Sequence, residues 1–294
     1  MKSPEVNIRD PYILLHEGKY YLYGTRSATT WGVADGFDCY VSEDLENWDG
    51  PFTVFHNDGS FPADRNYWAP EVYFYNEEFY FITTFGAENK GSWVQILKSK
   101  CPLGPFEKHS EGEVTPSGWV CLDGTLYLDP NNKAYLVFSR SFFQERNAGM
   151  YAVELKKDLS APVGEPKLMF YASEAPWSLP FPYAKQEFGI EEDVYFSDGP
   201  FFYRTKDGGL SMIWSSWGEN GYTVGIAHSD NKEIDGNWIH EETPLFEKDG
   251  GHGMIFKTKE DKLMLALHFP NEKLNEHPAF YELIEENNVL KIKN

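Results

Sequence analysis

Five similar segments recur along the 294-residue chain, and this repetition constrains the fold more than any other feature. Each segment opens with a polar or Pro/Gly turn, continues as an apolar and aromatic strand, and returns through a short polar turn into a second strand. The turns contain Gly, Asn and Asp, which tolerate the positive φ angles of tight hairpins. The five segments are residues 9–25, 69–85, 122–139, 197–216 and 251–268.

A second hairpin follows each of the first four segments, as in residues 37–55, 93–109 and 222–240. The repeat interval is roughly 50 to 75 residues, which is the size of a four-stranded propeller blade. Several strands alternate with period two, and no long window has helical periodicity. We therefore predict an all-β fold, a five-bladed β-propeller made by residues 1–294 as a single domain. A β-sandwich with coincidental hairpins is the alternative.

Composition allows a large core, because 41% of residues are hydrophobic and 17% are aromatic. No apolar run is long enough to span a bilayer, and the first ten residues lack the apolar stretch of a signal peptide. Three cysteines, Cys39, Cys101 and Cys121, fit neither a disulfide framework nor a zinc site. We expect a cytoplasmic protein, with a trimmed export signal as the alternative.

The formal net charge is −20, so the surface repels nucleic acid and anionic membranes, and we expect neither as a partner. A neutral partner such as an oligosaccharide suits this charge. Acidity that serves only solubility explains the charge equally well. The sequence does not indicate an oligomeric state.

Acidic residues open several of the predicted inner strands. The first strand of each propeller blade lines the central channel, so residues at its start converge on one end of the axis. A turn role explains each aspartate taken singly. As a set they favour a site that uses two protonation states, as glycoside hydrolysis does with one acid and one base. The positions we assign to these starts are Asp10, Glu71, Asp123, Asp198 and His252.

Four short motifs carry a family resemblance. They are Arg-Asp-Pro at 9–11, Ser-Glu-Asp-Leu-Glu-Asn-Trp at 42–48, Trp-Ala-Pro-Glu at 68–71 and Leu-Asp-Gly-Thr at 122–125. In this order and spacing the chain resembles glycoside hydrolase family 43 over nearly its whole length. The resemblance implies an inverting glycosidase of the α-L-arabinofuranosidase or β-xylosidase type, acting on arabinose- or xylose-containing oligosaccharides.

The resemblance also implies residue roles. Asp10 matches the general base, and Asp123 matches the aspartate that orients the acid, raises its pKa and stays ionised. The family's acid is usually Glu, but Asp198 stands here, with a side chain shorter by about 1.5 Å and an intrinsic pKa of about 3.9 against 4.3. We expect Asp198 to be the acid, with Glu192 as runner-up. The base and acid carboxyls should lie roughly 6.5–9.5 Å apart, which leaves room for a water.

His252 lies where family members carry a histidine on the channel axis, so it is a candidate for substrate binding. The resemblance implies that no cofactor is required. In some members a calcium ion lies near this histidine, often held through water. A lone histidine is more often a hydrogen-bonded structural residue, and calcium prefers several oxygen ligands.

Tryptophans at the channel mouth suit a sugar pocket, because the C–H faces of sugars pack on indole rings. Trp68, Trp31 and Trp119 are the candidates for sugar contact, against the alternative that they pack between blades. Arg140 is a candidate for binding substrate hydroxyls or for neutralising the aspartates. The long connection 171–197, rich in Pro and aromatic residues, should shape subsites beside the acid, or else cover a blade edge.

Two other functions remain in competition. A retaining five-bladed glycosidase would place its nucleophile carboxyl about 5–5.5 Å from the acid. A propeller that binds glycans without catalysis would tolerate Asp at position 198, where the resemblance leads us to expect Glu.

Overall fold

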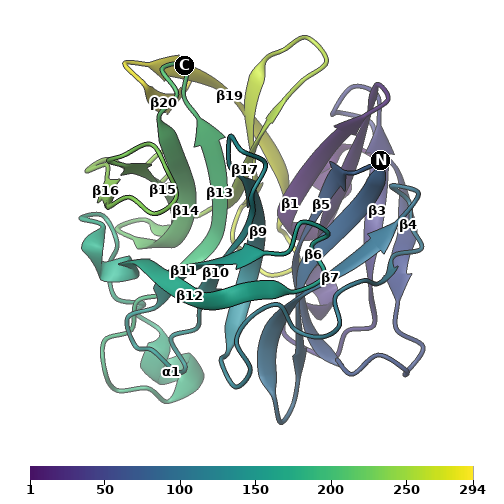
Figure 1. The fold of residues 1–294 in the computed structure, drawn as a ribbon, viewed down its shortest axis with the longest axis horizontal. Helices are drawn as coiled ribbons and strands as arrows, with labels where there is room; N and C mark the ends of the chain where they lie inside the picture. Colours follow the sequence, from purple (N-terminus) through teal and green to yellow (C-terminus); the bar gives the residue numbers. More distant parts are fainter. Residues whose placement is uncertain (294) are drawn as a thin grey trace.

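The computed structural model describes residues 1–293 and consists of five four-stranded antiparallel sheets arranged as blades around an axis (Figure 1). Within each blade the four strands follow one another in sequence order from the inner to the outer edge. The prediction of an all-β five-bladed propeller is confirmed. The assignment of the whole chain to a single domain stays a prediction.

The strand bounds are as follows. Blade 1 contains β1 (Ile8–His16), β2 (Lys19–Arg26), β3 (Gly36–Ser42) and β4 (Asp49–His56). Blade 2 contains β5 (Arg65–Tyr75), β6 (Glu78–Ala87), β7 (Gly91–Ser99) and β8 (Glu107–Lys108). Blade 3 contains β9 (Cys121–Leu128), β10 (Ala134–Arg140), β11 (Gly149–Leu155) and β12 (Pro162–Tyr171). Blade 4 contains β13 (Asp198–Arg204), β14 (Leu210–Gly218), β15 (Gly221–Ser229) and β16 (Trp238–His240). Blade 5 contains β17 (Gly251–Lys257), β18 (Leu263–Phe269), β19 (His277–Glu286) and β20 (Val289–Ile292).

Helical structure is confined to short pieces in the connections. These are the 3₁₀ turns η1 (Ser3–Glu5), η2 (Ser27–Thr29) and η3 (Ala172–Glu174), and the α-helix α1 (Ala184–Phe188). Across residues 1–293, none of these helices has the length and apolar character that crossing a membrane requires.

The innermost strands form a closed ring. β1 contacts β5, β5 contacts β9, β9 contacts β13, β13 contacts β17, and β17 contacts β1 again. Each blade is built from one continuous stretch of chain, so the contact between β1 and blade 5 closes the ring.

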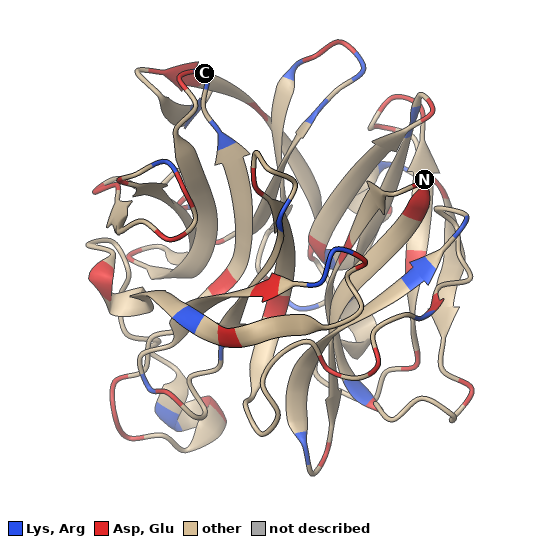
Figure 2. Ribbon diagram, in the orientation of Figure 1, with Lys and Arg blue, Asp and Glu red and all other residues tan. Residues whose placement is uncertain are grey.

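The core lies in layers between neighbouring blades. One layer joins blades 2 and 3 through residues such as Ile82 and Leu136, and another joins blades 3 and 4 through residues such as Val137 and Trp214. β-branched and aromatic side chains favour strands because they fill such pleated, buried surfaces. Charged residues lie mainly on loops and strand ends (Figure 2).

In β5, Asn66 has a positive φ of 53 next to the start of the strand. Apart from Asn66, each inner strand has one residue with positive φ near its start, where its pairing with the second strand slips. These five residues are Asp10 (φ 51), Ala69 (φ 45), Asp123 (φ 56), Gly199 (φ 51) and His252 (φ 52). The prediction that Glu71 and Asp198 occupy equivalent positions is therefore wrong. Glu71 lies two residues after the positive-φ residue of its strand, and Asp198 lies one residue before that of its own strand. A bulge inserts a residue, so simple alternation does not report the register beyond it.

A ring of hydrogen bonds uses these five positions. In four of the five blade junctions, the backbone N–H of the positive-φ residue donates to a side chain of the preceding blade's second strand. The four bonds are Ala69 to Thr25 Oγ1 (2.8 Å), Asp123 to Thr84 Oγ1 (2.8 Å), His252 to Ser215 Oγ (2.9 Å) and Asp10 to His268 Nδ1 (3.2 Å). At the junction of blades 3 and 4 the Gly199 N–H donates instead to Asp123 Oδ2, at 3.2 Å.

Candidate active site

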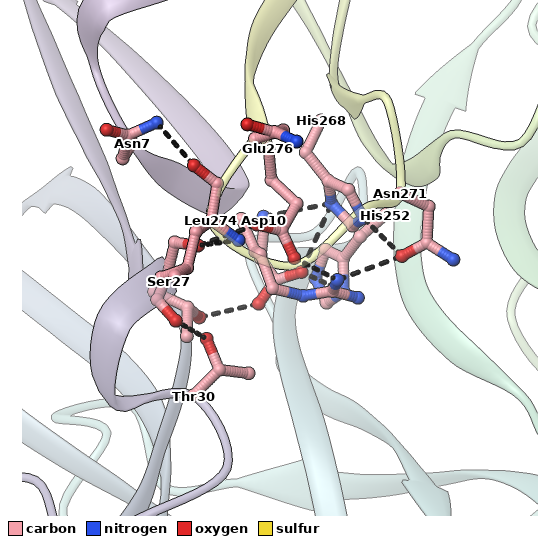
Figure 3. Close-up of polar contacts among 12 residues, drawn as sticks. Asn7, Asp10, Ser27, Thr30, His252, His268, Asn271, Leu274 and Glu276 are labelled. Carbon is pink, nitrogen blue, oxygen red and sulfur yellow. Dashed lines mark hydrogen bonds and ion pairs between the residues drawn. The ribbon is translucent and has the colours of Figure 1, made fainter.

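Asp10 lies at the start of β1 with 8% of its surface exposed. The Thr25 hydroxyl donates to Asp10 Oδ2 at 2.5 Å. Burial alone would raise the pKa of Asp10, but the neighbouring His252 and Arg9 outweigh it, and this pKa lies below its usual value. Asp10 is therefore held as a carboxylate in a buried position. Figure 3 shows His252 and His268 beside it.

His268, from β18, is fully buried against the backbone of Asp10. Its Nδ1 accepts the Asp10 N–H, so the ring proton is assigned to Nε2, which lies 3.4 Å from Asn271 Oδ1 (Figure 3). Burial holds the pKa of His268 well below its usual value. Because this ring is neutral, the 3.4 Å approach of Nδ1 to Asp10 Oδ1 is a packing contact and not an ion pair.

His252 connects two of the carboxyls. Its Nδ1 lies 3.4 Å from Asp10 Oδ1 and 3.6 Å from Asp123 Oδ2. Burial lowers its pKa, although Asp10 opposes the change. A neutral imidazole beside two carboxyls can donate its ring N–H to one of them or accept a proton from one that is protonated.

Asp123 and Asp198 form the other half of the cluster. Burial raises the pKa of Asp123 well above its usual value, with repulsion from Asp198 adding to the effect. Burial likewise raises the pKa of Asp198 to about 7. Two buried carboxyls that repel one another keep at least one proton near neutrality. Asp123 is 5% exposed and Asp198 is half-buried, so Asp198 is the more accessible of the two.

Tyr222, at the start of β15, was not anticipated from the sequence. Its hydroxyl donates to Asp198 Oδ2 at 3.1 Å, and its ring stacks on His268 with centroids 5.5 Å apart. It therefore links the Asp198 side of the site to the Asp10 side. Its only sequence signal is a preceding Gly, so β15 could not be connected to the site in advance.

A buried ion pair supports the Asp10 side and was also not anticipated. Arg9 Nη1 lies 3.0 Å from Glu276 Oε1 and donates to Asn271 Oδ1 at 2.9 Å. The Ser27 hydroxyl donates to the other Glu276 oxygen at 2.6 Å. Glu276 is 1% exposed, so both of its oxygens are paired as a buried carboxylate requires.

Glu71 lies two residues beyond the positive-φ residue of β5 and is 8% exposed. The Tyr73 hydroxyl donates to it and also lies 3.0 Å from Thr125 Oγ1. Burial raises the pKa of Glu71 to about 8. Glu71 is therefore protonated and uncharged at neutral pH, and its polar neighbours are hydroxyl groups and not cations.

Two of the predicted sugar-contact tryptophans lie together near Arg9. The ring centroids of Trp31 and Trp68 are 5.6 Å apart, and the Trp68 indole N–H donates to the Thr30 carbonyl at 2.6 Å. Trp31 is 62% exposed and the Arg9 guanidinium lies 5.7 Å from its ring. Much of the Trp31 indole is therefore exposed beside Arg9, the residue that precedes Asp10 in the chain.

The remaining predicted residues have their contacts outside the carboxyl cluster. The Arg140 guanidinium stacks 4.0 Å from the Trp119 ring, and its charged neighbour is Glu145, at 3.9 Å, and not an aspartate of the cluster. Glu192 is mostly exposed and lies 3.7 Å from Arg146 Nε. The structure does not bring Glu192 to the carboxyl cluster.

The described part of the chain, residues 1–293, contains no group of three or more His, Cys, Asp or Glu side chains placed to hold a metal ion. The Nδ1 of His252 faces carboxyls, and calcium needs six to eight oxygen ligands. These residues do not fit a directly bound calcium. A calcium ion held through water stays a prediction.

The arrangement thus joins four groups from four blades in one buried cluster. One carboxyl has a lowered pKa, two have raised pKa values, and a neutral imidazole lies between. Carboxyl groups with pKa values pushed apart can act as base and acid in one reaction.

Comparison with known proteins gives a family and a set of similar folds. Residues 4–286 match the family described as Glycosyl hydrolases family 43. A search of curated proteins finds no match. The structure is similar to that of an endo-arabinase from Bacteroides thetaiotaomicron VPI-5482, with 34% identity, 98% of each chain covered and a TM-score of 0.88.

Two less similar structures extend the comparison. An α-L-arabinofuranosidase from Lactobacillus brevis has 18% identity and a TM-score of 0.73, covering 98% of this chain and 96% of its own. A family 43 β-1,3-galactosidase has 18% identity and a TM-score of 0.74, covering 98% and 94%. At these identities the likeness shows the fold alone.

Proposed function

We propose that this chain, which belongs to glycosyl hydrolase family 43 and is a glycoside hydrolase, cleaves arabinose- or xylose-containing glycans. In this proposal the reaction inverts the configuration at the anomeric carbon. The observation that carries the proposal is the opposed pKa shifts of Asp10 and Asp198 within one buried cluster. An inverting glycosidase needs such a pair, one group ionised and the other protonated.

Asp10 is the general base in this mechanism. Thr25 occupies one of its oxygens, and the other faces His252. Asp10 accepts a proton from a water, which attacks the anomeric carbon from the face opposite the leaving group. The bond from this carbon to the leaving oxygen breaks as the new bond forms, so the configuration inverts.

Asp198 is the general acid and protonates the leaving oxygen. Its pKa of about 7 keeps it largely protonated below neutrality. The role predicted for Asp123 needs refinement, because a permanently ionised Asp123 does not follow from its raised pKa. Instead Asp123 shares the proton of the pair. The Gly199 N–H bond to Asp123 Oδ2 fixes its position beside the acid.

Arabinose is the sugar that the comparisons favour. The endo-arabinase is 34% identical over 98% of both chains, and the arabinofuranosidase and galactosidase support only the fold. The exposed Trp31 ring beside Arg9 suits a sugar ring.

The test is hydrolysis of linear arabinan, arabino-oligosaccharides and xylo-oligosaccharides by the wild type, Asp10→Asn and Asp198→Asn, with the first anomer followed by NMR. We expect release of the inverted anomer and a loss of kcat of at least about 100-fold in each variant, the usual contribution of general acid–base catalysis. Glu192→Gln is the control and should keep full activity. Release of the retained anomer would support the retaining reading, and binding without turnover would support a non-catalytic propeller.

A further inference from the structure

Exposed aromatic side chains gather in one region between blades 3 and 4. Phe143 is 52% exposed, Tyr183 is 44% exposed and Phe188 is 41% exposed. Phe142 and Phe181 lie between them, and the Phe143 and Phe188 centroids are 5.2 Å apart. We call these five residues the aromatic platform.

The platform lies on the same face as the carboxyl cluster. Phe142 and Phe143 follow Arg140, which pairs with Cys121 two residues before Asp123. The other three belong to the connection that ends at Ser197, directly before Asp198. In Figure 1 this connection, with α1, extends below the end of the blade at which β13 begins.

A chain of ring contacts connects the platform to the acid. Tyr222 donates to Asp198, and its ring centroid is 5.9 Å from that of Phe196. Phe196 lies 5.7 Å from Phe181, which lies 6.2 Å from Phe188. Packed aromatic rings therefore extend from the platform to the Asp198 side of the site.

Polar contacts at the surface and apolar packing beneath it hold the platform in place. The Arg146 guanidinium donates to the carbonyls of Phe142 (2.9 Å) and Phe143 (3.2 Å), and its Nε lies 3.7 Å from Glu192. Phe142 and Phe181 pack on a buried cluster of Ala184, Ile190 and Val194. A surface fixed before binding loses little conformational entropy when a ligand arrives.

We propose that the aromatic platform binds sugar units of the glycan chain on the leaving-group side of the cleaved bond. The inference rests on the proposed function, because the acid protonates the leaving oxygen and the platform continues from the acid. Sugar C–H faces pack on aromatic rings, and a neutral chain is not repelled by a protein of net charge −20. The enzyme therefore prefers chains that extend several units past the cleaved bond.

The experiment compares the wild type with the double variant F143A/F188A on a length series of arabino-oligosaccharides and on linear arabinan. We expect kcat/KM to fall about three- to tenfold for long chains, mainly through KM, and to stay unchanged for the shortest cleaved substrate. Phe143→Trp should retain the preference for long chains. Phe74→Ala, an equally exposed aromatic at the β5–β6 turn, is the matched control and should change nothing.

If kcat/KM of F143A/F188A falls equally for substrates of every length, or for none of them, the platform does not bind the glycan chain. The proposed function is unaffected by that result. If the wild type cleaves none of these glycans, the proposed function fails. Native gels containing arabinan then show whether the glycan retards the wild type more than F143A/F188A, as binding by the platform requires. Sedimentation is measured alongside, because a wild-type dimer that becomes monomeric in F143A/F188A would assign the platform to contact between copies and overturn glycan binding.

Discussion

Asp10 and Asp198 should set the two limbs of the pH–rate profile, because one must be ionised and the other protonated. The pKa of Asp10 lies below its usual 3.8 and that of Asp198 is about 7. We expect kcat/KM to be level between about pH 4 and pH 6, to reach half of its plateau at about pH 7, and to fall tenfold per unit well above pH 7. Measurements from pH 3 to 9 test this, with preincubation controls for unfolding. Activity that rises above pH 8 would contradict the assignment of the acid.

Glu71 gives a stability prediction whose sign follows from its raised pKa. The folded protein holds the Glu71 proton up to about pH 8, and the unfolded chain releases it near 4.5. Its contribution to stability is therefore complete below pH 4.5 and is lost as the pH rises toward 8. Glu71→Gln should raise the free energy of unfolding at pH 7.5 by an amount on the order of 1–3 kcal/mol, from about 1.4 kcal/mol per pKa unit.

Urea unfolding of the wild type and Glu71→Gln at pH 4.5 and pH 7.5 measures this difference. The two proteins should be nearly equal at pH 4.5, where both side chains are neutral. An equal gain at both pH values would show that the effect of the amide is steric and that Glu71 does not titrate as described.

At the scale of the strands, the hydrogen bonds between blades make a further prediction. Thr84, on β6, is fully buried and accepts the Asp123 N–H at 2.8 Å. Thr84→Val keeps the shape but leaves that N–H without an acceptor, which costs about 1–3 kcal/mol of unfolding free energy. Thr53→Val, on the exposed strand β4, is the control and should stay within about 0.5 kcal/mol.

Activity separates two readings of this bond. Asp123 is linked through Thr84 to blade 2 and through Gly199 to blade 4, so loosening one link should also lower kcat. Denaturant titration and kcat are measured on the same samples. A variant with normal stability would contradict the view that these bonds join blade to blade.

The element scale also shows what the sequence can and cannot predict. Paired hairpins at blade-sized spacing predict the inner strands, so the meeting of Asp10, Asp123, Asp198 and His252 could be anticipated from ring closure alone. The register could not, because a bulge at each positive-φ residue shifts the faces of the residues beyond it. Residues on other strands and loops carry no local signal of their contacts, because those depend on how the blades meet. Tyr222 and Phe143 are examples.

At the scale of the whole molecule, the net charge of −20 should oppose folding through self-repulsion. Salt screens this repulsion, since the Debye length falls from about 30 Å at 0.01 M to about 3 Å at 1 M. We expect Tm to rise by several degrees between 0.02 and 0.5 M NaCl, at about 2–4 °C for each kcal/mol gained.

The same salt series separates the effect of the protein's own charge on stability from any effect of substrate charge on activity. A neutral glycan feels no long-range field, so kcat/KM on arabinan should change less than about twofold across the range in which Tm rises. Calorimetry and initial rates in the same buffers provide the measurement. A kcat/KM that follows the Debye length would point to a charged substrate, because screening then acts on encounter with the site. A constant kcat/KM with a rising Tm places the excess acidity on the surface of the fold and outside the recognition of the sugar.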